Sequence, residues 1–300
     1  APLIGSLNEV LESGIGEEEE LMVQISHNMG NRTFLFSMPM RKFFDKSLVA
    51  NERGSTENPQ AQRPLNGPHA TKLAKFMLKG LISATREKLR QQKKQESEAL
   101  TALEEMLGKQ PYVSMQPVVC NLRDIKPTLH NIRGERVLSE GTKETVGFKV
   151  WLSQTHMLYV VDGQHRREGM RILFEFLNGA IAAQKGGVSK FPTKNNLLAP
   201  LKGELTVEQK VALQEILATA STFATVQIET HLGLDIDQER QLFHDLNNLG
   251  KKVEASLALQ FDNSNPVNNF IKEVLIDDDS IMPWDIIEKD VTDWQKDTGA

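Results

Sequence analysis

Six consecutive residues, 162–167, read Asp-Gly-Gln-His-Arg-Arg and bring together an acid, an imidazole and two guanidinium groups. Guanidinium groups match the geometry of phosphate oxygens, and an imidazole can donate to a phosphate or transfer a proton. A carboxylate beside phosphates can hold Mg²⁺. The hexapeptide predicts a phosphate-binding site. Its candidate ligands are Gly163, Gln164, His165, Arg166 and Arg167, its candidate catalytic groups are Asp162 and His165, and its candidate magnesium ligand is Asp162.

The elements on either side of this hexapeptide predict a strand-to-helix turn. An apolar run over 156–161 precedes it, and a helical pattern over 164–178 follows it. A helix start favours anions because its first N–H groups point outward and carry a partial positive charge. Gly163 either lets a ligand approach the backbone or supplies a positive φ. The alternative is structural: Asp162 only caps the helix, and His165 only bonds to a neighbouring strand.

The rest of the chain interleaves strand and helix patterns. Strands are expected over 33–44 up to Pro39, in 111–122, in 147–163 with a turn near 153–155, and over 222–230. Helices are expected over 69–81, 169–184 and 237–250, and after a capping box formed by Thr206 and Gln209. This order predicts an α/β or α+β fold, with a mixed sheet and packed helices.

The segment 82–110 is rich in helix formers, with a basic first half, an acidic second half and few apolar residues in its middle. We expect a helical insertion that stands partly free of the core. It is either simply solvated or binds DNA or a partner. The candidate DNA contacts are Arg86, Lys88, Arg90, Lys93 and Lys94.

Composition limits the class of protein. The 300 residues carry a net charge of −5. This charge argues against a protein that coats nucleic acid, but it is compatible with a local basic face. The one cysteine, Cys120, excludes an intrachain disulfide and a multi-cysteine zinc site. Its apolar surroundings predict a buried, inert thiol and favour a reducing cytoplasm. No apolar run is long enough for a membrane helix, no secretory signal is visible at the start, and the sequence does not begin with Met.

Three segments in order resemble the DGQHR-domain family, especially its DndB-like branch. They are VVDGQHRREGM (160–170), AQRPLNGPHATKLAKFML (61–78) and QLFHDLNNLGKKVEASLALQFD (241–262). The resemblance implies a ParB/sulfiredoxin-like core. For DndB-like members it implies sequence-specific DNA binding and repression of DNA phosphorothioation genes, and for the related DpdB-type proteins it implies nucleotide hydrolysis that supports base exchange in DNA. Arg63 and Asn247 match the family's Arg and Asn, so the resemblance implies that Asn247 lines the same pocket and that Arg63 reaches the same phosphate. Otherwise they are a surface ion-pair residue and an exposed helical residue.

These observations lead to three functional hypotheses. The first is a DNA-binding regulator of a phosphorothioation-type system with a phosphate-binding turn. The second is an accessory protein that binds and hydrolyses ATP with Mg²⁺, and the third is a structural adaptor whose long basic helix docks a partner. The expected partners are DNA, other proteins of the system and a second copy of the chain, with no membrane. The expected organisation is an arm (1–30), a core (31–262) that includes the insertion 82–110, and a helical C-terminal segment (263–300).

Overall fold

In the part of the chain that the structure describes, a mixed sheet of eight strands organises the fold, in the order β3-β7-β4-β8-β2-β1-β6-β5. The computed structural model describes residues 18–49, 67–110, 112–123, 125, 129, 132–182, 196–198, 205–248 and 270. The strands are β1 (Glu18–Asn28), β2 (Asn31–Pro39), β3 (Ser47–Val49), β4 (Val118–Leu122), β5 (Arg133–Leu138), β6 (Thr145–Ser153), β7 (Leu158–Asp162) and β8 (Thr225–Leu232). Two pairs are parallel, β3 with β7 and β4 with β8, and the other pairs are antiparallel.

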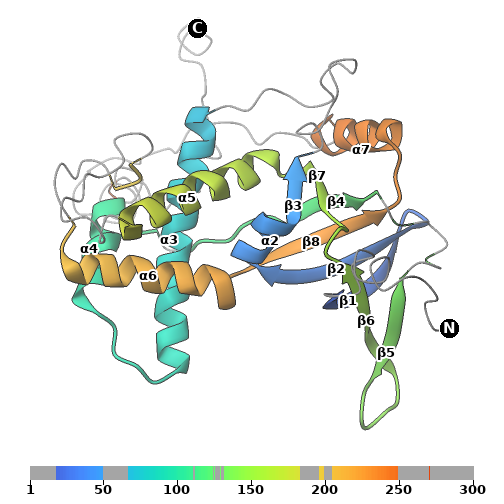
Figure 1. Cartoon of the computed structure of the whole chain (residues 1–300), viewed down its shortest axis with the longest axis horizontal. Coiled ribbons are helices and arrows are strands. Elements are labelled where there is room, and N and C mark those ends of the chain that lie inside the picture. The colour runs from blue at the N-terminus through green and yellow to red at the C-terminus, as the bar shows by residue number, and fades with distance from the viewer. Residues whose placement is uncertain are drawn as a thin grey trace, which may run out of the picture.

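Helices cover one side of this sheet, as Figure 1 shows for α3, α5 and α6. The helices are α2 (Met40–Lys46), α3 (Gly67–Gln91), α4 (Glu98–Leu107), α5 (Gln164–Ala182), α6 (Val207–Thr222) and α7 (Ile236–Asn248). The capping box predicted for α6 is present, because Thr206 and Gln209 exchange hydrogen bonds between side chain and backbone. The expected class, a mixed sheet with packed helices, is confirmed.

The core lies between the sheet and its helices because the strands alternate as the period of two requires. Val23, Phe36 and Ile228 are buried, whereas their neighbours Met22 and Leu35 are exposed. Cys120 is buried on β4, as expected, and burial raises the pKa of its thiol above the ordinary value. In the part of the chain that the structure describes, no helix is both long and apolar enough to cross a membrane.

The segment 82–110 packs on the core more than expected of an insertion that stands partly free of it. α3 continues through it to Gln91 and buries Ile82 and Leu89, and α4 buries Leu100 and Leu103. The two helices form a hairpin that belongs to the hydrophobic core. Apolar residues are sparse in the middle of the segment because the exposed polar residues 92–97 separate the buried face of α3 from that of α4.

The expected arm is also different where the structure describes it. From Glu18 the chain forms β1, which pairs with β2 and β6 inside the sheet, rather than an arm. Residues 1–17 lie outside the described residues. The expected C-terminal segment 263–300 does too, apart from residue 270.

Candidate functional site

The turn at Gly163 connects the end of β7 to the start of α5, as predicted. Gly163 has φ +107°, a backbone conformation that residues other than glycine rarely adopt. A Cβ added there would also come within 3.0 Å of Arg166 Nε and of Val118 Cγ1. Glycine is therefore required both for its backbone angle and because the Arg166 side chain packs directly against it.

Arg166 is held beside the turn by three acceptors. Its Nη2 donates to the Asp162 carboxylate, and its Nη1 donates to the carbonyl oxygens of Gln116 (3.1 Å) and Pro117 (2.9 Å). The Arg166 side chain is 13% exposed and that of Asp162 is 35% exposed. The pair thus fixes a guanidinium at the turn and leaves the carboxylate open to solvent on one side.

Asp162 was also the candidate magnesium ligand. Its carboxylate already accepts from a guanidinium, and the described residues include no cluster of three or more His, Cys, Asp or Glu side chains that could hold a metal ion. Mg²⁺ is commonly held by only one or two carboxylates together with waters and phosphate oxygens, so the magnesium role of Asp162 stays a prediction.

Arg167 points into the protein, unlike its neighbour. Its Nε donates to the Ser47 carbonyl (3.1 Å) and hydroxyl (3.0 Å), and its Nη2 donates to the same carbonyl (2.7 Å). Its guanidinium also lies 5.1 Å from the ring centroid of Phe44. Arg167 was predicted to bind phosphate, but these contacts make it a buried link between α5 and the edge strand β3.

His165 lies against a second histidine, His69, from the first turn of α3. The two ring centroids are 5.3 Å apart in an edge-to-face arrangement. Burial lowers the pKa of His165, and the neighbouring His69 lowers it further, against smaller opposite effects of Asp162 and Glu168. Sequence reasoning missed His69, although it lies within the upstream segment 61–78 that resembles the family.

The helices α3 and α5 can bring these rings together because they pack very closely. A Cβ on Gly169 of α5 would come within 3.1 Å of Leu73 Cβ and 3.3 Å of the Ala70 carbonyl oxygen. A larger residue would separate the two helix starts. Gln164, the first residue of α5, is buried at the same place.

The structure describes one of the two other predicted site residues. Asn247 is exposed at the end of α7, and its amide donates to the Phe243 carbonyl of its own helix (2.8 Å). α7 itself packs beside β7 (Figure 1). Arg63 lies outside the described residues.

A buried carboxylate that the sequence did not reveal fastens α7 to the sheet. Glu239 accepts from Asn121 Nδ2 (2.7 Å) and from Arg123 Nε (2.8 Å) and Nη2 (2.6 Å). The hydrogen bond from Arg123 to Glu239 raises the pKa of Arg123, whose guanidinium also lies 4.0 Å from the ring centroid of Tyr159. Glu239 is therefore a positioning residue for α7.

The five candidate DNA contacts of segment 82–110 have different surroundings. Arg86 pairs with Glu96 and with Glu104 (2.6 Å), and Arg90 pairs with Glu87 (2.6 Å) although it is 77% exposed. Lys88 Nζ lies 3.5 Å from the Thr222 hydroxyl. Lys93 and Lys94 are exposed. The acidic half of the segment thus folds back onto the basic half.

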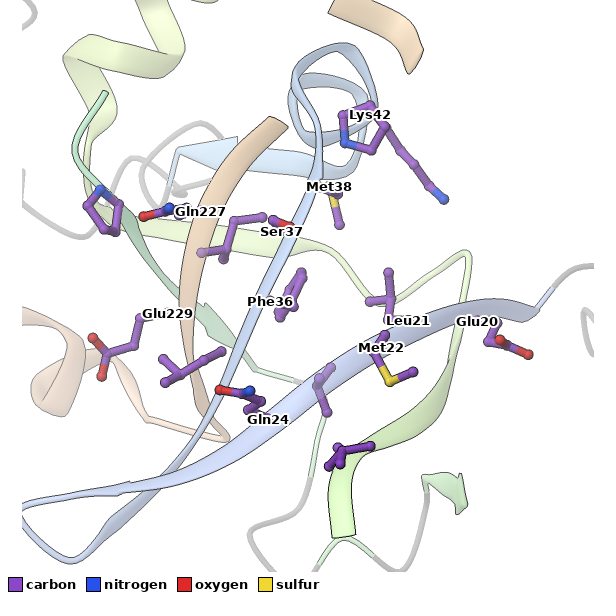
Figure 2. A pocket seen from close by; sticks show the side chains of 17 residues that line it. Glu20, Leu21, Met22, Gln24, Phe36, Ser37, Met38, Lys42, Gln227 and Glu229 are labelled. Carbon is purple, nitrogen blue, oxygen red and sulfur yellow. The ribbon is translucent and has the colours of Figure 1, made fainter. Parts of the chain in front are cut away.

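A hollow of about 730 Å³ lies on the sheet, lined by residues of β1, β2 and β8. Figure 2 shows Glu20, Glu229 and Lys42 around it, together with uncharged side chains such as Gln24 and Gln227. Lys42 is paired with Glu19 (2.8 Å), so the charge of this hollow disfavours phosphate. Its edge reaches Pro117, whose carbonyl accepts from Arg166.

A comparison with protein families finds one that matches most of the chain. The family model described as DndB, DNA-sulfur modification-associated, matches residues 22–289. Neither the curated proteins nor the solved structures contain a match. The expected ParB/sulfiredoxin-like core thus stays a prediction.

Proposed function

The chain belongs to the DndB family of DNA-sulfur modification-associated proteins, and we propose that it is a DNA-binding regulator whose DGQHR turn holds a phosphate of the DNA. Family membership makes it a component of a DNA-sulfur modification system, where it is associated with other proteins of that system. DNA binding and the role of the turn are the parts that we propose.

The observation that carries the proposal is the geometry of the turn. The first helical hydrogen bond of α5 runs from Arg167 N to Gly163 O (2.9 Å), so the N–H groups of residues 164–166 lie ahead of the helix's own ladder. His165 and the guanidinium of Arg166 accompany this helix start. Such a combination favours an anion, and phosphate is the anion that DNA supplies.

The same chemistry would accept the phosphates of ATP, so the experiment compares the two ligands. Fluorescence anisotropy measures binding of a labelled fragment from upstream of the modification genes, of a scrambled duplex, and of labelled ATP with and without Mg²⁺. The proposal expects tighter binding of the upstream fragment than of the scrambled one at the same salt.

The decisive variant is Arg166→Ala, which removes a charge-assisted contact. Its DNA affinity should fall about 10- to 100-fold, from ~1.5–3 kcal/mol per contact. Arg171→Ala is the control, because Arg171 lies on the same helix but pairs with Glu168 and Glu175. If Arg166→Ala is folded and binds as the parent does, the turn is not the phosphate site.

Asp162→Asn separates the regulator from the nucleotide hydrolase. Removing this carboxylate leaves the Arg166 charge less neutralised, so DNA should bind as tightly as before or tighter. ATP turnover that depends on Mg²⁺ and disappears in Asp162→Asn would instead support the hydrolase.

A further inference from the structure

We infer that the outer face of α3, from His69 through Lys72, Lys75 and Lys79, is a track that holds the backbone of a nucleic acid whose phosphate lies on the DGQHR turn. This inference rests on the proposed function and adds a surface to it. The starting point is the contact between His69 and His165, which places the beginning of α3 at the turn.

The three lysines lie on one face of the helix, opposite the core. At 3.6 residues per turn, positions 72, 75 and 79 fall within an arc of about 60°. The buried residues of the same stretch, Ala70, Ala74, Met77 and Leu78, lie on the other side. In Figure 1 α3 crosses α5 and then α6, so a nucleic-acid strand that follows α3 from its beginning would extend from the turn in that direction.

The half of α3 that touches the turn carries cations without carboxylates. Residues 67–80 contain three lysines and no acidic residue, whereas 81–91 contain three cations and one carboxylate, and two of those cations are ion-paired. No ion pair with another described residue is found for the three lysines, in contrast to Arg86 and Arg90. Lys79 Nζ lies near Gly108, at the end of α4, where the helix dipole also favours a cation.

The length of the track indicates a polynucleotide rather than a single nucleotide. From His69 to Lys79 the helix rises about 15 Å. That is about four steps of 3.4 Å along one strand of DNA. The phosphates of one nucleotide would reach the turn alone, so the lysines are expected to distinguish DNA from ATP.

The test is the double variant Lys72→Glu/Lys75→Glu, measured with duplex DNA across a salt series and with ATP. Its control is Arg136→Glu/Lys143→Glu, which makes the same change in net charge on exposed residues of the β5–β6 hairpin. The track variant should bind DNA about 10- to 100-fold more weakly at low salt, and the slope of log K against log[salt] should shrink by about 2. ATP binding should stay within about two-fold of the parent, and urea unfolding should show that the variant is folded.

Each other outcome overturns the inference in a distinguishable way. If the parent binds DNA and the track variant binds equally well, the track is wrong and the turn stands. An equal loss in the hairpin control means that total charge, rather than this face, controls binding. If the DNA affinity of the track variant is unchanged but binding of a polyglutamate peptide is lost, the face recognises an acidic protein. If the parent binds no duplex, the proposed function fails and the track with it.

Discussion

Arg166 and Arg167 are adjacent in sequence and have opposite tasks in the structure. The first stays at the turn, bonded to Asp162 and to two carbonyls of the chain before β4. The second lies in the interior and donates hydrogen bonds to the Ser47 carbonyl oxygen. Residues next to each other on a helix point about 100° apart. When the Arg166 side chain lies at the turn, that of Arg167 therefore points in a different direction, here into the interior.

Replacing Arg167 should therefore affect stability before it affects binding. Arg167→Ala leaves the buried Ser47 carbonyl without these donors, which should cost about 1–3 kcal/mol in the free energy of unfolding. Urea denaturation measures it, and Arg171→Ala, an exposed pair, should cost about 0–1 kcal/mol. Unchanged stability with lost DNA affinity would instead assign Arg167 to the ligand.

The histidine pair should make binding depend on pH. The pKa of His165 lies below its ordinary value because of burial and then His69, whereas a bound phosphate favours the imidazolium. DNA affinity should therefore rise as pH falls from about 7.5 to 6. His165→Gln should flatten this dependence in anisotropy titrations. A pH profile that is identical in the variant would exclude His165 from the site.

The free energy of unfolding of the protein without DNA should fall as pH falls, opposite to the DNA affinity. A histidine with a lowered pKa prefers to be neutral in the folded state, so its contribution is fully present above pH about 6.5 and is lost as pH falls through the folded pKa. His231, buried on β8, has a pKa lowered by burial and adds to the same loss. DNA should protect against this loss of stability in the parent but less in His165→Gln.

At the scale of the elements, the position of α7 depends on one buried polar contact. It packs on β7 and is fastened to β4 and the residue after it through Glu239, Asn121 and Arg123. Breaking a buried ion pair costs about 3–5 kcal/mol. We expect about 2 kcal/mol for Glu239→Gln, because Arg123 is 27% exposed and stays partly solvated.

Hydrogen exchange is the measurement that separates a local effect from a global one. In Glu239→Gln the amides of α7 should exchange about 30-fold faster, the equivalent of 2 kcal/mol, while those of β8 stay protected. Arg240→Ala, which breaks an exposed pair with Asp237, should leave α7 unchanged. Equal acceleration throughout the sheet would show that Glu239 stabilises the whole fold instead.

At the scale of the whole molecule, the proposed DNA binding would use a small basic surface, because the protein as a whole is acidic. The net charge is −5, and the proposed contacts are His165, Arg166 and the lysines of α3. With three to four phosphate contacts, log K should fall against log[salt] with a slope of about −3. A slope steeper than about −6, measured by anisotropy from 50 to 200 mM salt, would require a much larger interface than the turn and track.

Several elements were predicted correctly from local patterns in the sequence. The strand-turn-helix around Gly163, the capped start of α6 and the helix α7 were all predictable, because a glycine at a turn, a capping box and a period of 3.6 act between residues a few positions apart. The burial of Cys120 followed from its apolar run in the same way.

Only the tertiary structure decided which side chains meet. His69 and His165 come from different helices, Glu239 bonds to Asn121 across 118 positions, and Arg167 bonds to Ser47 across 120. The core role of 82–107 likewise depends on α6 and α5 as packing surfaces. The hexapeptide DGQHRR therefore predicted the turn by itself, and its phosphate chemistry stays a proposal. The placement of Arg166 beside the turn, of Arg167 in the interior and of His69 against His165 required the packing of α3 and β3 against α5, since contacts between distant segments leave no periodic pattern in the sequence.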